Sequence, residues 1–456
     1  MDTPTAAGTL RAGRREWIGL AVLALPTLLA ALDFSVLFLA LPFLGADLQA
    51  SNAQLLWITD IYGFMVAGFL VTMGTLGDRI GRRKLLMIGA AVFGAVSIVA
   101  AYATSAEMLI LARAVLGIAG ATLAPSVLAL ITNMFRDPRQ RATAISLWAT
   151  CLLAGVAIGP IVGGVLLEVF WWGSVFLIGV PVMVILLLTA PFLLPEFRDE
   201  EAGRLDLVSV ALSLAAILPI IYGLKDLAEN GFGGVPVLAI VAGGAFGALF
   251  VGRQRRLTHP LLDMRLFGNR SFSAALGIHL LGSLLVGGVG FFYAQYLQLV
   301  HGLEPLRAGL WLIPDALGLI AGALISPVIA RRVRPGTAIA LGMAVMAVGF
   351  LMLTQVETTS GLVFVVSGVV LVSLGIAPSF VLSTDLVVGS VPPTKAGSAS
   401  SLSETGGELG IALGVALLGS VGAAVYRMQL AETMPSGLPG EAVTAAEESL
   451  AAAADA

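Results

Sequence analysis

Thirteen apolar runs follow one another along nearly the whole chain, and this repetition constrains the fold more than any other feature. A helix needs about 20 consecutive apolar residues to cross the hydrocarbon core of a bilayer. Of the 456 residues, 58% are hydrophobic and only 12% are charged, which is about half the charge of an average soluble domain. The sequence therefore predicts an all-α polytopic membrane protein. The predicted spans are residues 17–41, 53–75, 84–103, 107–131, 141–167, 172–194, 206–226, 234–252, 272–299, 306–330, 336–355, 360–386 and 397–425.

Most of the 25 basic residues fall in alternate connections between these spans. Cytoplasmic loops of membrane proteins carry such an excess of arginine and lysine, so we expect the N-terminus to lie in the cytoplasm. Arginine also far outnumbers lysine, which is typical of a GC-rich bacterial genome and indicates a bacterial plasma membrane. The basic groups are residues 11–15, 79–84, 136–141, 198–204, 253–270 and 331–334.

The connection after the second span reads GTLGDRIGRRKLL, residues 74–86. A basic cytoplasmic loop with a turn glycine would explain the arginines, but not the fixed order of glycine, acid and arginine. In this order we expect Gly74 and Gly77 to allow close helix approach and Asp78 to cap or pair. The positions that make up the order are Gly74, Gly77, Asp78, Arg79, Gly81, Arg82 and Arg83.

The fifth span contains a second ordered string, AGVAIGPIVGG, at residues 154–164. Small residues at every fourth position let helices pack closely in a membrane, and neighbouring helices can satisfy the backbone groups that a proline frees. We therefore expect this span to pack tightly against others. Its motif positions are Gly155, Gly159, Pro160, Gly163 and Gly164.

These two strings resemble the signature loop of the major facilitator superfamily and the G-x-x-x-G-P-x-x-G-G motif of its antiporter branches. The resemblance is closest to the fourteen-span drug:proton antiporters, which include quaternary-ammonium and multidrug efflux pumps of actinobacterial type. It implies a major facilitator fold, in which two six-helix halves flank two inserted spans. Further stretches that resemble this branch are residues 31–42, 55–64, 259–272 and 400–410.

On this resemblance the second half has five spans in this sequence, and the last span of the family has no counterpart. Either the protein ends in an external tail, or the sequence stops before a last span, and we favour the second reading. The expected organisation is a cytoplasmic N-terminus at 1–16, a six-helix half at 17–198, the inserted spans and linker at 199–271, the second half at 272–426 and an external polar tail at 427–456.

Three charged residues lie within the spans of the first half. From the rise of a helix, Asp33, Asp60 and Arg113 all lie about 9–12 Å below the outer surface. Arg113 is the intramembrane arginine that the resemblance leads us to expect. Its charge balances only one of the two carboxylates, so we expect Asp33 and Asp60 to bind substrate or protons; a static ion network that fixes helix register is the alternative. Trp57 and Tyr62 flank Asp60 and could stack on a cationic substrate or pack in the core.

The second half carries three intramembrane carboxylates. Asp315 falls near the middle of its span, and we expect it to be a substrate or proton group particular to this protein. Glu404 and Glu408 are four residues apart and therefore share one helix face. Tyr293 and Gln295 belong to an aromatic and amide cluster that could form an interfacial belt or line the substrate path.

The sequence therefore predicts a secondary active transporter that exports lipophilic cationic drugs in exchange for protons by alternating access. We expect no cofactor besides the proton gradient, since the chain has no G-x-x-x-x-G-K-[ST] string for ATP. It has no catalytic pair and no metal-binding spacing, so we expect neither an enzyme nor a metal site. We expect the partners to be small cations, protons and the lipid bilayer, with no nucleic acid, and the protein to be a monomer.

Two alternatives remain open at the level of the sequence. The same fold could run as a proton-coupled importer of a small solute, although the glycine-proline string of the fifth span argues against it. The chain could also be a sensor that keeps the fold and transports nothing. Transport assays with Asp60→Asn separate a pump from a sensor.

Overall fold

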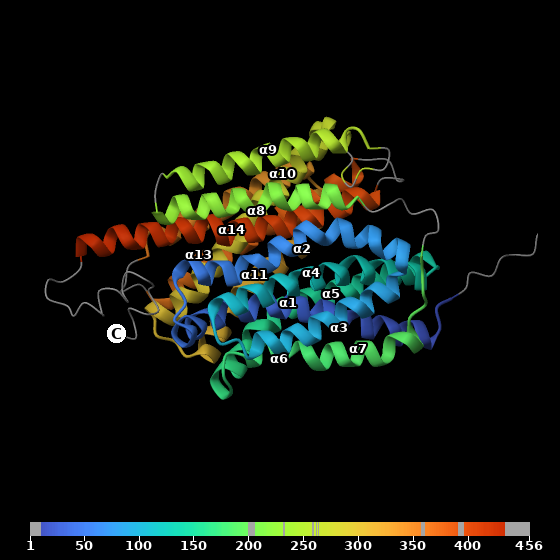
Figure 1. Ribbon diagram of the computed structural model, residues 1–456, viewed down its shortest axis with the longest axis horizontal. Helices are drawn as coiled ribbons and strands as arrows, with labels where there is room; N and C mark the ends of the chain where they lie inside the picture. The colour runs from blue at the N-terminus through green and yellow to red at the C-terminus, as the bar shows by residue number, and fades with distance from the viewer. Residues whose placement is uncertain are drawn as a thin grey trace, which may run out of the picture.

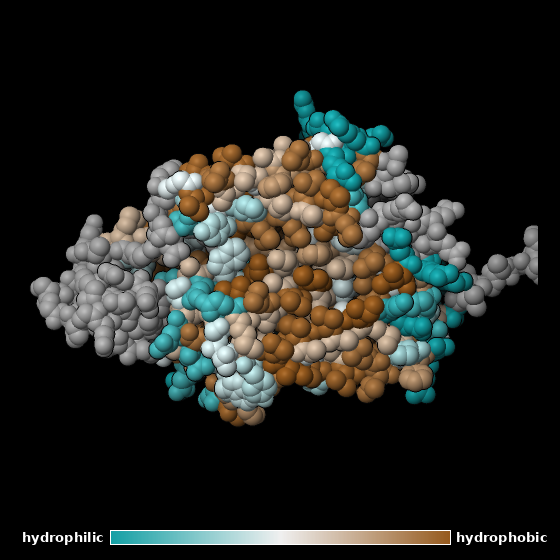
Figure 2. Space-filling model, viewed as in Figure 1, coloured by the Kyte–Doolittle hydropathy of each residue, from teal (hydrophilic) through white to brown (hydrophobic). Residues whose placement is uncertain are grey.

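The structure is a computed structural model that describes residues 11–198, 206–230, 233–257, 260, 262, 264–356, 361–390 and 396–433. Within these residues the secondary structure is helical, with no strand. Thirteen helices are long and apolar enough to cross a membrane, which confirms the predicted number. The helices lie roughly side by side along one direction (Figure 1). An apolar band covers the middle of the bundle, and hydrophilic residues gather towards both ends (Figure 2), as expected for a multi-pass membrane protein.

Seven helices precede the inserted pair. They are α1 (Arg14–Leu48), α2 (Asn52–Ile80), α3 (Arg82–Ala101), α4 (Ala106–Met134), α5 (Pro138–Val169), the short α6 (Ser174–Leu177) and α7 (Gly179–Leu193). Two of them begin at serine caps, because the Ser51 side chain accepts from the Gln54 amide and the Ser105 side chain accepts from the Met108 amide. Such caps satisfy amides that have no partner within the helix.

The inserted pair and the second half follow in chain order. They are α8 (Leu207–Asn230), α9 (Gly234–Gln254), the 3₁₀ turn η1 (Leu266–Gly268), α10 (Arg270–Gln295), the π-helical turn η2 (Tyr296–Val300), α11 (Pro305–Ala330), α12 (Pro335–Leu353), α13 (Leu362–Gly389) and α14 (Ala396–Thr433).

Several helices run beyond the predicted spans; α1, for example, ends at Leu48 where residue 41 was the expected end. The span expected at 172–194 is divided into α6 and α7 at Ile178. Helix α14 continues to Thr433, so the tail expected from residue 427 is helical over its first residues. The rest of the expected tail, residues 434–456, lies outside the described residues. The polar composition of the segment after residue 426 had indicated a break that the backbone does not make there.

The helices form two packed groups that meet along a seam. In the first group α1 packs on α5 and α7, and α2 and α3 pack on α4. In the second group α10 packs on α13 and α14, and α13 also packs on α11 and α12. Across the seam α2 packs on α14, and α5 packs on α11. The division into halves at the expected residue numbers stays a prediction.

The inserted helices α8 and α9 pack on each other, and α8 also packs on α2 and α14 (Figure 1). A small apolar cluster joins these three helices through Phe64, Ile221, Ala412 and Ala416. Helix α8 therefore contacts both sides of the seam.

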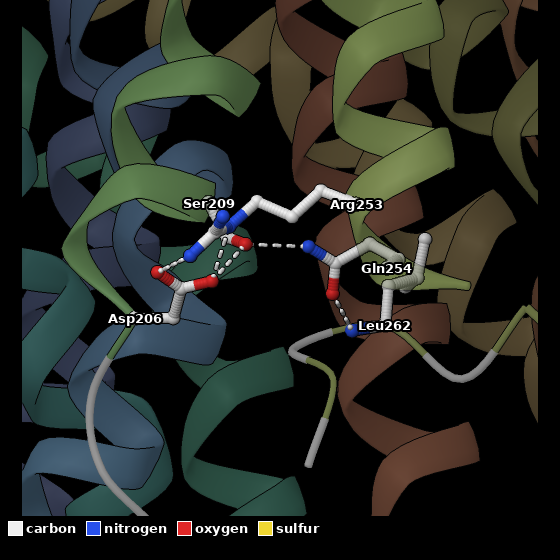
Figure 3. Close-up of polar contacts among 5 residues, drawn as sticks. All are labelled: Asp206, Ser209, Arg253, Gln254 and Leu262. Carbon is white, nitrogen blue, oxygen red and sulfur yellow. Dashed lines mark hydrogen bonds and ion pairs between the residues drawn. The ribbon is translucent and has the colours of Figure 1, made fainter. Parts of the chain in front are cut away.

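A polar cluster fastens one end of the inserted pair (Figure 3). Arg253 donates from Nε and Nη2 to the two carboxylate oxygens of Asp206, at 2.8 and 2.9 Å. The buried Gln254 donates to the Ser209 hydroxyl at 2.7 Å and accepts from the Leu262 amide at 3.2 Å. Because Leu262 belongs to the linker that leads to α10, the same cluster ties the inserted pair to the chain entering the second half.

Candidate functional site

A buried ion pair links α1 to α4. Nη1 of Arg113 donates to Oδ2 of Asp33 at 2.7 Å, and Nε of Arg113 donates to the Ile58 carbonyl at 3.1 Å. Only 2% of Arg113 is exposed. Helix α2 can approach this closely because α4 has a glycine there; a methyl group at Gly117 would lie 2.5 Å from the carbonyl oxygen of Tyr62. The arginine therefore joins three helices at one point.

Residues of α2 complete the cluster around Arg113. The Tyr62 ring lies under the guanidinium, with 4.5 Å from Cζ to the ring centroid, which is a cation–π geometry. Asp60 is 1% exposed and lies three and four positions before Gly63 and Phe64, so it shares the face of α2 that packs on α14. Trp57 is partly buried one turn earlier. Arg113 therefore occupies one face of the Tyr62 ring.

Helix α14 brings the glutamates of the second half to this cluster. A methyl group at Gly63 of α2 would lie 3.0 Å from Cβ of Ala412 and 3.8 Å from the Glu408 carbonyl oxygen. Glu408 also lies within electrostatic range of the Tyr62 hydroxyl. Glu404 lies one turn before Glu408, and both side chains are partly buried. Carboxylates from both halves therefore meet near the α2–α14 seam.

Asp315 belongs to a separate polar group within the second half. The Ser373 hydroxyl of α13 donates to Oδ1 of Asp315 on α11. The Tyr293 hydroxyl of α10 donates to the Trp311 carbonyl at 2.7 Å and lies within electrostatic range of Asp315. Gln295 lies two residues beyond Tyr293 and is partly buried. The structure therefore brings Tyr293 and Asp315 together, but it does not join Asp315 to the Arg113 cluster by any contact among the described residues.

The loop motif between α2 and α3 docks on the end of α7. Gly81 adopts φ +110°, a conformation that side-chain-bearing residues rarely adopt. The Arg83 guanidinium donates to the Pro191 and Leu194 carbonyls at 3.3 and 3.0 Å. Glu196 accepts from the Arg83 amide at 3.0 Å and lies 3.5 Å from its Nε. The motif thus holds the ends of α2, α3 and α7 together.

The other motif positions differ in how closely neighbouring atoms approach them and in how exposed they are. A methyl group at Gly77 would lie 2.9 Å from Cδ of Arg82, so this glycine allows close packing. A methyl group at Gly74 would meet nothing within 4 Å, so among the described residues no neighbour approaches α2 closely at this position. Arg79 is exposed, and the side chain of Asp78 lies outside the described part of the structure.

The glycine-proline string of α5 faces two helices. On one face, methyl groups at Gly155 and Gly163 would lie 2.6 Å from Cβ of Ala31 and 3.0 Å from Cγ1 of Val36, both on α1. Gly159 is buried between them. These glycines therefore serve packing within the first group of helices.

The other face of the string forms part of the seam. A methyl group at Gly164 would lie 2.6 Å from Cα of Leu306, and one at Gly309 would lie 2.1 Å from the Pro160 carbonyl oxygen. Helices α5 and α11 are thus in backbone contact, which only residues without a side chain permit.

The closest described contacts across the seam gather at one end of the bundle, where α1 ends and α2 begins. Besides the α5–α11 contact, Phe38 of α1 lies edge-on against Phe291 of α10, with 6.3 Å between ring centroids. On the other side of the seam, a methyl group at Gly419 of α14 would lie 2.5 Å from Cδ2 of Leu56. The seam is therefore closed at the end opposite the start of α1.

Two groups of apolar helices that meet along a glycine-lined seam, with charged side chains buried beside it, define a multi-pass membrane transporter rather than an enzyme. The sequence profile described as Major Facilitator Superfamily matches residues 23–415. The chain belongs to this superfamily, as its two motifs led us to expect.

Similar proteins agree with this assignment. The chain is 45% identical over 447 residues to the "Multidrug efflux pump LfrA" of Mycolicibacterium smegmatis, covering 98% of this chain and 88% of that one. It is 33% identical to the "Methyl viologen resistance protein SmvA" of Salmonella typhimurium, covering 96% and 88%. Among solved structures, a bacterial homologue of the human lysosomal transporter Spinster has the same fold, with a TM-score of 0.63 at 18% identity, covering 92% of this chain and 84% of that one.

Sequence reasoning missed two partners in these sites. Ser373, which bonds to Asp315, lies in an apolar helix where serines are common, so nothing in the sequence distinguished it. Glu196, which holds Arg83, follows the end of α7 and is 113 residues away in the chain. An acid directly after a span, opposite a basic loop, was the only signal that could have suggested it.

Proposed function

We propose that this protein is a proton-coupled antiporter that exports lipophilic cationic drugs across the bacterial plasma membrane by alternating access. The proposal rests on charged groups from both halves at a seam that is closed at one end. Asp33 pairs with Arg113, Glu408 lies within electrostatic range of the neighbouring Tyr62, and the buried Asp60 shares the face of α2 that packs on α14. In the membrane interior such charges are costly and mark substrate or proton pathways.

Exchange follows from the chemistry of a buried carboxylate. Such a group can be neutralised by a proton or by a substrate cation, but not by both at once. Because Arg113 already neutralises Asp33, we assign the exchange to Asp60 and to Glu404 and Glu408 of α14. Entry of a cation then releases the proton, and the proton that enters from the other side releases the cation.

The relatives support the substrate class. LfrA is named a multidrug efflux pump, and SmvA is named for resistance to methyl viologen, which is a dication. For this chain we therefore propose small, flat, lipophilic cations as substrates. Asp315 and Tyr293 form a second polar group, which we propose as a contact for substrates that reach the second half.

The orientation belongs to the same proposal. We propose that the start of α1 lies in the cytoplasm, since the basic connections gather at that end. The single cysteine makes this testable, because Cys151→Ser removes the only native thiol. On that background Arg256→Cys should be reachable only from inside the cell, and Thr104→Cys only from outside. The reverse labelling pattern would show that the proposed orientation, and with it the proposed direction of transport, is wrong.

The test of function uses ethidium efflux from cells that express the chain, followed by fluorescence. Cells with the wild-type chain should extrude ethidium, and a protonophore should stop them. Asp60→Asn should abolish efflux, whereas Glu107→Gln, which removes an exposed acid from α4, should not. Unchanged efflux in Asp60→Asn, at equal amounts of protein in the membrane, would contradict the role assigned to Asp60.

Proton coupling needs the purified protein in liposomes. An imposed pH gradient, acid inside, should drive ethidium into the lumen, where it accumulates against its own gradient. If instead a gradient that is acid outside drives accumulation, the protein is an importer. Binding of ethidium without accumulation under either gradient would favour a sensor.

A further inference from the structure

A groove lies on the outside of the bundle between α3 and α7, at the end where α1 begins. Its volume is about 500 Å³, and it is open to the side. Helices α3 and α7 pack together at one edge of the bundle (Figure 1), on the side away from α8 and α9. The groove is therefore separate from the seam and from the buried carboxylates, and it faces the surrounding lipid.

The polar end of the groove carries a net positive charge. Two basic residues, Arg83 and Lys84, and one acid, Glu196, line it. Arg83 is already held by Glu196 and by two carbonyls of α7. Lys84 is exposed, and no described group accepts a hydrogen bond from its ammonium. One cation at this end thus remains available to a ligand.

The rest of the groove is apolar. Met87, Ile88 and Ala91 follow Lys84 at positions three, four and seven, so all four lie on one face of α3, and Leu187 of α7 completes the wall. Ile88 is 47% exposed. From Lys84 to Ala91 the helix rises about 10 Å. With Lys84 at the level of the lipid headgroups, Ala91 lies at the level of the upper acyl chains.

We propose that this groove binds an anionic glycerophospholipid, with its phosphate on Lys84 and an acyl chain along Ile88 and Ala91. The order of the lining, basic at the bundle end and apolar below it, matches the order of groups in such a lipid. The surplus positive charge favours an anionic headgroup over a zwitterionic one, since a lysine near the membrane surface attracts anionic lipid. The bound lipid would brace the loop of Gly81 against α7.

The test measures lipid bound to the full chain purified in detergent, by native mass spectrometry with added dioleoyl phosphatidylglycerol or dioleoyl phosphatidylcholine. The wild-type chain should retain phosphatidylglycerol at concentrations where phosphatidylcholine is lost. Lys84→Gln should weaken phosphatidylglycerol binding about fivefold, the loss expected for one lysine at a membrane surface. Ala91→Trp should fill the groove and abolish the specific adduct.

Two matched variants control for charge and size. Arg256→Gln removes an exposed arginine outside the groove, and Val92→Trp introduces the same side chain at the next position of α3, which does not line it. Neither should change lipid retention. Equal retention of the two lipids, an equal loss in Lys84→Gln and Arg256→Gln, or full binding in Ala91→Trp would each overturn the proposal. Lys84→Gln alters an exposed side chain, so its result stands even where Ala91→Trp fails to fold.

Discussion

The guanidinium of Arg113 lies 2.7 Å from the carboxylate of Asp33, at a position where only 2% of the arginine is exposed. A buried ion pair of this kind contributes little net stability as a whole, but removal of one partner leaves an uncompensated charge. The pair therefore fixes how α1 and α4 face each other, and it does so beside the carboxylates proposed for exchange.

Asp33→Asn should destabilise the protein strongly, because it leaves Arg113 without its counter-ion. Breaking a buried pair in this way costs about 3–5 kcal/mol. The thermal midpoint of the detergent-purified protein measures the loss. The double variant Asp33→Asn/Arg113→Gln should recover part of it, since both charges are then absent.

Glu107→Gln is the control for Asp33→Asn. Glu107 also lies on α4, but it is exposed and accepts from the Gln54 amide group at 2.6 Å. Its substitution should leave the thermal midpoint near that of the wild type. A loss in Asp33→Asn no greater than in this control would contradict the structural role of the pair.

Gly81→Ala should destabilise the loop between α2 and α3 for two reasons. The backbone at φ +110° costs about 1–3 kcal/mol for a residue with a side chain. The new methyl group would also lie within 2.4 Å of Oε1 of Glu196, so the glutamate must leave Arg83. The thermal midpoint should fall, and protease cleavage at the loop should accelerate.

The matched variant is Gly74→Ala in the same motif. A methyl group there meets no described atom within 4 Å, and alanine is favoured over glycine in a helix by up to about 1 kcal/mol. Its stability should therefore equal or exceed that of the wild type. If both variants lose stability equally, the conformation at Gly81 is not what the motif preserves.

Gly309→Ala should hinder closure of the seam. Its methyl group would lie 2.1 Å from the Pro160 carbonyl oxygen, so α5 and α11 must separate. Forced overpacking of this kind costs about 1–3 kcal/mol, which shifts a two-state equilibrium about 5- to 150-fold. We expect ethidium efflux to fall while the protein stays folded.

Opening of the seam can be measured by the labelling rate of a single thiol placed in it. On the Cys151→Ser background, Phe38→Cys places a buried thiol at the closed end of the seam. Gly309→Ala should increase its rate of maleimide labelling, whereas Gly277→Ala, where a methyl group meets nothing within 4 Å, should not. Unchanged labelling in Gly309→Ala would mean that the α5–α11 contact does not control this end.

The membrane fold and the common level of Asp33 and Arg113 could be predicted from the sequence, because both depend on local properties. Run length gave thirteen spans, and the helical rise put Asp33 and Arg113 in the same layer, where the structure pairs them. The rotation of each helix could not be predicted. In lipid an outward face is as apolar as a packed one, so periodicity does not show which residues meet. The contact of Ser373 with Asp315 and that of α14 with Gly63 needed the structure.

The pH dependence of stability should depend in part on Asp206. Hydrogen bonds from Arg253, and further ones from Ser209, hold the pKa of the Asp206 carboxyl well below its ordinary value (Figure 3). A carboxyl whose pKa is lower in the folded state than in the unfolded state adds stability above the unfolded pKa of about 4, and this stability is lost as the pH falls towards the folded pKa. Asp206→Asn should therefore lower the thermal midpoint at pH 7, and the difference from the wild type should shrink below about pH 4.

The comparison is made on detergent-purified protein between pH 7 and pH 3, with Asp385→Asn as the control because its carboxylate is exposed on α13. Arg253→Gln should reproduce the Asp206→Asn curve, since either change removes the same pair of hydrogen bonds. If the Asp206→Asn difference stays constant down to pH 3, the stability comes from packing at the start of α8 and not from the ionised pair. If it shrinks as expected, the charge pair is what joins α8 to α9 at this end, and through Gln254 it also holds the linker that enters the second half.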